Sequence, residues 1–117
     1  MFMCACEHCQ KATGSGHSAA AVLREESVTI VGETRSFTQP ANSGAAFTRN
    51  FCPQCGTPIW ARSSRWPDAV ILPVGIFGAD TDWFVPSQVI FARSHRDWDW
   101  LPDALPRYLT YRDEETL

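Results

Sequence analysis

The amino-acid sequence predicts a mainly β fold, an antiparallel sheet or sandwich with few short helices. Short β-branched and aromatic segments recur along the 117 residues and are separated by turns that contain glycine and proline. Five cysteines fall into two tight groups, which is typical of small domains that a metal ion stabilises. The length corresponds to one domain, which we expect over residues 1–110, with a solvated C-terminal tail over residues 111–117.

The β pattern is carried by several segments in chain order. They are rich in apolar or β-branched side chains and cover residues 18–23, 28–31, 35–37, 45–51, 57–62, 70–77 and 85–92. The most apolar segment, residues 70–77, is the best candidate for a central strand. Pro73 within it predicts a bulge or an edge position, because proline cannot donate to a ladder. Short helical turns are expected at residues 7–12 and 102–109.

The spacing of the cysteines indicates metal binding. Cys4, Cys6 and Cys9 form C-x-C-x-x-C, and Cys52 and Cys55 form C-x-x-C. Thiolates are soft ligands, and a C-x-x-C turn lets two sulfur atoms reach one ion. A closed structural zinc site uses four protein ligands, whereas a catalytic site uses three and keeps one position open. The odd number of cysteines therefore leaves two alternatives, one closed site or an open site beside an incomplete one.

The first group is the better candidate for catalysis, because three sulfur atoms within six residues can face one ion. An open fourth position accepts water or a substrate sulfur, and a cation there stabilises the thiolate form of that sulfur. The pattern predicts zinc as cofactor, Cys4, Cys6 and Cys9 as catalytic ligands, and a small thiol such as glutathione as substrate.

Three interpretations of Cys52 and Cys55 stay open. They can complete a closed site with the first group, they can perform redox chemistry, or they can form a zinc knuckle between two strands. The β pattern of residues 45–51 and 57–62 on either side favours the knuckle.

Charge and hydropathy exclude two classes of partner. The net charge is −3 and no basic block rises above this background, so we expect no nucleic-acid partner. The sequence has no apolar run of about 18 residues and no signal-peptide pattern, so we expect no membrane association and a cytoplasmic protein. In a reducing cytosol, closely spaced cysteines are ligands or redox groups more often than disulfides.

These motifs together resemble the glutathione-dependent formaldehyde-activating enzyme (GFA) family, also called the centromere-protein-V (CENP-V) domain family. The resemblance covers about residues 3–110. It rests on the following motifs: Cys4-x-Cys6-x-x-Cys9-Gln10-Lys11-Ala12-x-Gly14, Val31-Gly32-Glu33, Phe51-Cys52-x-x-Cys55-Gly56-Thr57-Pro58-Ile59, Trp98, and Leu105-Pro106-Arg107-Tyr108.

The resemblance implies a zinc-binding β fold of the Mss4-like type and a carbon–sulfur lyase activity like that of S-(hydroxymethyl)glutathione synthase, with glutathione and formaldehyde. It also implies that Cys4, Cys6 and Cys9 hold a catalytic zinc and that Cys52 and Cys55 hold half of a structural zinc. The family's other half is an earlier C-x-C on an N-terminal strand, which we expect to be absent here. Two alternatives follow, a shortened gene product or a different metal arrangement. We therefore expect one tightly held zinc and an exposed sheet edge through which the chain forms a homo-oligomer.

A non-catalytic zinc-binding domain, serving as a binding module or glutathione carrier, is the alternative function. A closed four-ligand site and the lack of a readable general base would favour it. His17 is a candidate base, although a polar residue at a strand edge is the simpler interpretation. Arg49, Arg62 and Arg93 are candidates for binding the two carboxylates of glutathione.

Overall fold

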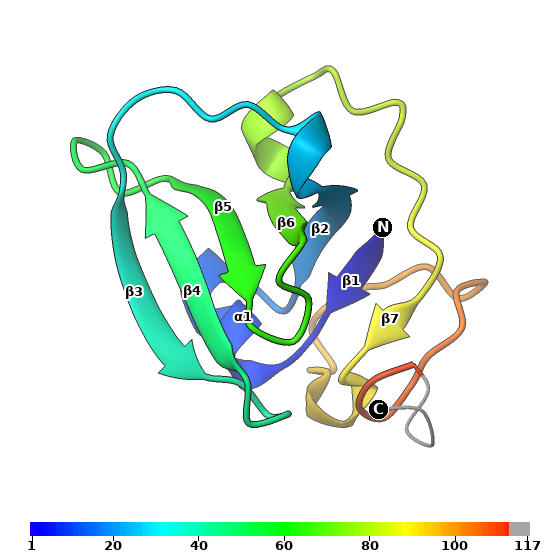
Figure 1. Ribbon diagram of the computed structural model, residues 1–117. Coiled ribbons are helices and arrows are strands. Elements are labelled where there is room, and N and C mark those ends of the chain that lie inside the picture. Colours follow the sequence, from blue (N-terminus) through cyan, green and yellow to red (C-terminus); the bar gives the residue numbers. More distant parts are fainter. Residues whose placement is uncertain (113–117) are drawn as a thin grey trace. The chain divides into compact units, whose positions relative to one another are not determined.

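The computed structural model describes residues 1–112, and the chain divides into two compact units (Figure 1). The first unit combines Met1–Ala20 with the described residues from Phe77 onward, and the second unit is the continuous segment Ala21–Ile76. The prediction of one domain over residues 1–110 stays a prediction. Of the predicted tail, residues 113–117 lie outside the described part of the chain.

The fold is mainly β, as the sequence predicts. The strands are β1 (Phe2–Cys4), β2 (Ser18–Arg24), β3 (Arg35–Pro40), β4 (Ala46–Phe51), β5 (Pro58–Ser63), β6 (Ala69–Pro73) and β7 (Val89–Ile90). Hydrogen bonds connect them in the order β3-β4-β5-β6-β2-β1-β7. Strand β2 passes from the first unit into the second. The β1–β7 pair is parallel, so the sheet is mixed and the expectation of a purely antiparallel sheet is corrected there.

The second unit is built on an antiparallel meander of β3, β4, β5 and β6 (Figure 1). Strands β3 and β4 pair along their whole length, from Arg35 opposite Phe51 to Pro40 opposite Ala46. The buried side chains of this unit come mostly from β6 and its neighbours, and they include Ala61, Val70, Ile71 and Leu72. The most apolar segment of the sequence is therefore an interior strand, as its composition predicts.

The strand predicted over residues 70–77 is shorter than expected. It ends at Pro73, and Val74–Phe77 form the 3-10 helix η2. Because Pro73 has no N–H to donate, the ladder stops there, and neither a bulge nor an edge is needed.

The prediction of a strand over residues 28–31 is wrong. After the 3-10 helix η1 (Glu25–Ser27) these residues belong to no strand. Val28 has extended dihedral angles, φ −122° and ψ 127°, so the β-branched side chains do favour extended backbone. Val31 is 91% exposed, so its side chain gains nothing from a sheet. A β-strand forms only where a neighbouring strand pairs with it, and β propensity alone is not enough.

In the first unit, β1 lies between β2 and β7 (Figure 1). Cys4 stands opposite Ser18 of β2 on one side and Ile90 of β7 on the other. The helix α1 (Glu7–Thr13) follows β1 directly and confirms the helical turn expected over residues 7–12. The core cluster of this unit consists of Cys4, Cys6, Ile90 and Phe91, with Phe2, Cys9 and Tyr111 packed against it.

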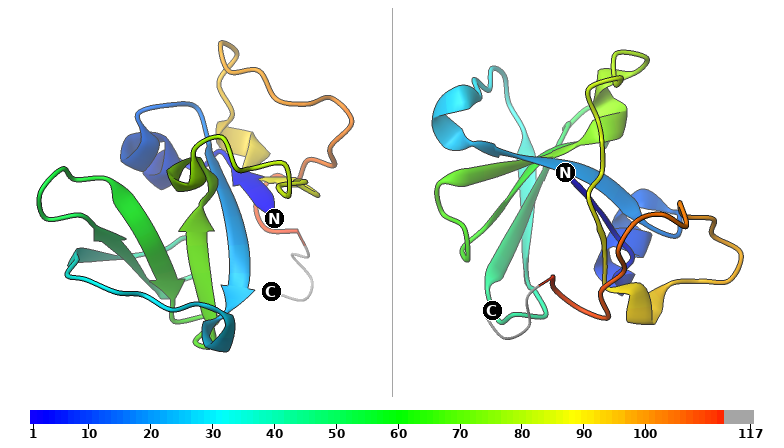
Figure 2. Two further views of the ribbon diagram at one scale, coloured as in Figure 1. Left: turned by 90° about the horizontal axis from the view of Figure 1, so that it is seen from above. Right: turned by 90° about the vertical axis from the view of Figure 1, so that its right-hand side faces the viewer.

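The chain after β7 has few regular elements (Figure 2). The predicted strand over residues 85–92 is reduced to Val89–Ile90, because Phe91 has a left-handed backbone (φ 56°) that turns the chain into the 3-10 helix η3 (Ala92–Ser94). The helical turn predicted over residues 102–109 is wrong. There the Pro106 carbonyl accepts the Val89 N–H and the Tyr108 N–H donates to the Val89 carbonyl, so these backbone groups pair with β7.

Candidate metal centre

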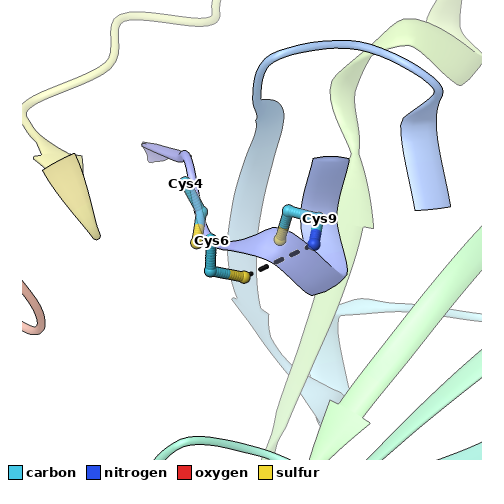
Figure 3. A group of neighbouring side chains, drawn as sticks. All are labelled: Cys4, Cys6 and Cys9. Carbon is cyan, nitrogen blue, oxygen red and sulfur yellow. Dashed lines mark hydrogen bonds between the residues drawn. The ribbon is translucent and has the colours of Figure 1, made fainter. Parts of the chain in front are cut away.

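Three thiols meet where β1 passes into α1 (Figure 3). Cys4 ends β1, Cys6 precedes α1, and Cys9 lies in the first turns of the helix. The three sulfur atoms lie within 4.8 Å of one another, and Cys4 and Cys6 are buried. This arrangement confirms that the C-x-C-x-x-C spacing gathers three soft donors at one point.

Capping interactions produce this geometry. Cys6 is the N-cap residue of α1, and its Sγ accepts the Cys9 backbone N–H at 3.4 Å. The helix ends at Gly14, whose left-handed backbone (φ 66°) lets its N–H donate to the Gln10 carbonyl. The short helix therefore has defined ends, and its start turns the Cys6 and Cys9 side chains toward each other.

The pKa values of the three thiols show that they interact strongly. Hydrogen bonds from the Cys4 and Cys9 thiols lower the pKa of Cys6, and the hydrogen bond to Cys6 raises the pKa of Cys4. The pKa of Cys9 is also raised, because its contact with Cys6 and its burial outweigh a lowering hydrogen bond with Cys4. Without a cation, the three thiols therefore do not titrate independently of one another.

A zinc ion fits this donor set. Zinc–sulfur bonds of about 2.3 Å in a tetrahedron place sulfur ligands roughly 3.8 Å apart, and the three sulfur atoms already lie within 4.8 Å of one another. Among residues 1–112, no histidine, aspartate, glutamate or further cysteine joins this group as a fourth ligand. The site therefore offers three thiolates and leaves one coordination position to a non-protein ligand.

Cys52 and Cys55 lie in the second unit, in the turn between β4 and β5. The Cys52 carbonyl accepts the Gly56 N–H, and the Cys52 Sγ accepts the Gln54 N–H at 3.4 Å. Gly56 has a φ of 77°, which favours glycine. A turn between strands is what the knuckle interpretation expects.

Only two ligands are present in this knuckle. The Cys55 thiol contacts the Thr57 hydroxyl at 3.1 Å, and this hydrogen bond lowers its pKa. Among the described residues, the group of three potential metal ligands consists of Cys4, Cys6 and Cys9, and it does not include Cys52 or Cys55. The knuckle therefore supplies two of the four ligands that a closed structural zinc site needs.

The structure gives His17 a partner that the sequence did not reveal. His17 Nδ1 lies 2.8 Å from Asp99 Oδ2, and His95 Nε2 lies 2.7 Å from the Asp99 backbone oxygen. The side chains of all three are largely buried, with 22%, 9% and 18% exposure for His17, Asp99 and His95. Asp99 was missed because it is 82 positions from His17, and no local pattern marks such a pair.

Gly16 makes room for this cluster, and its replacement should be costly. A Cβ atom at Gly16 would overlap the Asp99 carboxyl group and Cβ. We expect Gly16→Ala to lower the free energy of unfolding by about 1–3 kcal/mol, because Asp99 and its loop must move. Gly75→Ala is a matched control, since a Cβ there meets nothing within 4 Å. Equal urea midpoints for the two variants would contradict the expected overlap.

The three arginines that are candidates for binding the glutathione carboxylates differ in their contacts and in the unit to which they belong. Arg62 forms an ion pair with Glu25 and donates to the Pro67 carbonyl. The guanidinium of Arg49 lies over the Phe47 ring at 4.7 Å, and that of Arg93 lies over the Phe91 ring at 5.5 Å. Arg93 belongs to the same unit as the three thiols, and Arg49 and Arg62 belong to the other.

Fold and site together define a class of protein, a small β-sheet domain with three clustered thiols that can hold a metal ion. Residues 1–94 match the family described as glutathione-dependent formaldehyde-activating enzyme, so the chain belongs to this family. No match was found among the curated proteins. No helix in residues 1–112 is long and apolar enough to cross a membrane.

Proposed function

We propose that the chain is a zinc-dependent carbon–sulfur lyase-type enzyme that acts on a glutathione-like thiol and a small carbonyl compound such as formaldehyde. The observation that carries the proposal is the set of three converging thiols without a fourth protein ligand among the described residues. Family membership supports glutathione-dependent activation of formaldehyde in general.

The reaction joins the substrate sulfur to the carbonyl carbon. The sulfur–carbon bond forms, the carbonyl π pair moves to oxygen, and the thiol proton ends on that oxygen, so the product is an S-hydroxymethyl thiol. Cleavage is the reverse. Bound zinc would favour the thiolate form of the substrate over the thiol, which makes it a better nucleophile.

The chain's own residues bind and orient the reacting group. Cys4, Cys6 and Cys9 would hold the zinc as thiolates, the form that metal binding requires. The burial of Cys4, at 5% exposure, and of Cys6, at 8%, keeps water from most of the ligand set and strengthens electrostatic interactions there. The five free cysteines suit a reducing compartment such as the cytoplasm.

Cobalt-substituted protein provides the test. Adding glutathione should change the visible spectrum of the bound cobalt, because the substrate sulfur would enter the open position. Nuclear magnetic resonance with glutathione and labelled formaldehyde should show a faster approach to the S-hydroxymethyl product than without protein. Cys52→Ala serves as the control and should behave like the wild type, since the knuckle is outside the three-thiol group.

The outcomes separate the two candidate functions. A spectral change without faster turnover would favour a glutathione carrier. If neither glutathione nor other small thiols change the spectrum, the lyase proposal fails, and a structural role for the metal takes its place.

A further inference from the structure

Both the nitrogen and the oxygen of the Gln10 side-chain amide form hydrogen bonds. Its Nε2 donates to the Ala5 carbonyl at 2.8 Å and to the Ser94 carbonyl at 2.9 Å, and its Oε1 accepts from Arg96 Nε at 3.1 Å. All these residues belong to the first unit. Gln10 therefore connects α1 with the turn that carries the thiols and with the segment after β7.

The surroundings specify an amide rather than a carboxylate. Two backbone carbonyls can only accept, so they require the two donors of an NH₂ group. The Arg96 Nε–H can only donate, so it requires an oxygen. Glutamate would place oxygen against both carbonyl oxygens, although it would keep the contact with Arg96.

The contact with Ala5 matters most because Ala5 stands between two of the thiol ligands. Ala5 is fully buried, and its N–H donates to the Ile90 carbonyl of β7 at 3.0 Å. The Ala5 carbonyl, which leads into the Cys6 peptide, receives the Gln10 amide. Both polar backbone groups of Ala5, the residue between Cys4 and Cys6, are thus held, which restricts the directions in which the two cysteine side chains leave the chain.

We propose that Gln10 is a positioning residue of the metal centre, whose amide orients the Cys4 and Cys6 thiolates toward Cys9. The positioning role concerns the same three-thiolate site as the proposed function, and it rests on that function in this respect alone. Groups that hold metal ligands in place lower the ordering cost of binding, and their loss weakens metal affinity by about 10–100-fold.

Arg96 has a secondary part in this arrangement. Its Nε fixes which end of the Gln10 amide carries the oxygen, and its Nη2 lies 3.8 Å from Glu7 Oε1. That ion pair is exposed and contributes little. Loss of Arg96 should therefore weaken the amide's orientation but leave both donations to the carbonyls intact.

The test compares Gln10→Met and Gln10→Glu with the wild type. Cobalt affinity is measured by competition with a chelator of known strength, and the visible spectrum reports the ligand geometry. We expect about 10–100-fold weaker affinity and an altered spectrum in both variants, and a smaller change in Arg96→Ala. Gln10→Met keeps the length of the side chain, and circular dichroism in each case shows whether the fold is retained.

Thr38→Val is the matched control. It removes another side-chain hydrogen bond, to Thr48 in the second unit, and should leave cobalt affinity and spectrum unchanged. If both Gln10 variants bind cobalt with wild-type affinity and spectrum, or lose only thermal stability, the positioning role is refuted. If neither glutathione nor other small thiols change the wild-type spectrum while the Gln10 variants still bind cobalt weakly, the lyase proposal fails and the positioning role stands.

Discussion

Replacing Cys6 by serine should abolish zinc binding and turnover while leaving α1 in place. Serine is a good N-cap residue, so its hydroxyl can accept the Cys9 N–H that the Cys6 Sγ accepts now. It is a poor zinc ligand, however, because its oxygen does not ionise near neutral pH as a thiol does. The substitution thus separates the two roles that Cys6 has in the structure.

Elemental analysis after dialysis and circular dichroism are the measurements. We expect about one zinc per wild-type chain and less than a tenth of that in Cys6→Ser, with the same circular dichroism in both. Cys6→Ala should lose the zinc and also the cap, at about 1 kcal/mol. Cys52→Ala should keep one zinc. Full zinc occupancy in Cys6→Ser would show that the metal lies elsewhere, and two tightly held zincs per wild-type chain would show that the knuckle binds metal strongly.

Removal of the metal should produce the largest change in stability. A ligand present at about a thousand times its dissociation constant adds about 4 kcal/mol to the folded state. For a chain of this size we therefore expect a strong chelator to lower the melting temperature by about 10–20 °C. Differential scanning calorimetry with and without chelator checks this, and Cys6→Ser gives the reference, since chelator should not affect it. An unchanged wild-type midpoint would mean that the ion contributes nothing to folding.

The same stabilisation should depend on pH in a definite direction. In the metal-free protein the pKa values of Cys4 and Cys9 are raised, chiefly through their contacts with neighbouring thiols, so protons compete with the metal for these ligands. Zinc binding displaces the protons, so the metal's contribution is present at high pH and declines as the pH falls through the raised pKa values of Cys4 and Cys9. Melting temperatures of zinc-loaded protein should therefore converge on those of chelated protein on acidification. If the difference between the melting temperatures of zinc-loaded and chelated protein widened on acidification, zinc binding would not be displacing protons.

Local chemistry explains what the sequence could predict of this protein. The three thiols come from six consecutive residues, so one turn and one helical cap are enough to bring them near one another. Strands β4 and β5 were also predictable, because alternating side chains flank a turn that contains Pro53 and Gly56. The predicted range for β4 begins one residue early, and the predicted range for β5 is shifted by one residue at both ends.

Features that depend on distant partners could not be predicted in this way. Residues 28–31 have strong β propensity but no neighbouring strand, and β7 ends at Ile90 because the left-handed backbone of Phe91 turns the chain away. The His17–Asp99 contact spans 82 positions and the Gln10–Ser94 contact spans 84. Nothing in the residue types at either end distinguishes such pairs from ordinary polar surface residues. The predictions of no nucleic-acid partner and of a homo-oligomer stay predictions.

The order of synthesis has a consequence for metal loading. The frame of the three-thiol centre is discontinuous, because Ile90 and Ser94 hold a turn that begins at Cys4. At 5–20 residues per second, the ribosome adds these partners roughly 4–17 s after the thiols themselves. The second unit is continuous, so its β4–β5 knuckle can form from a nascent chain that still lacks β7. A metal ion can thus encounter the knuckle thiols before the three-thiol centre has its final arrangement.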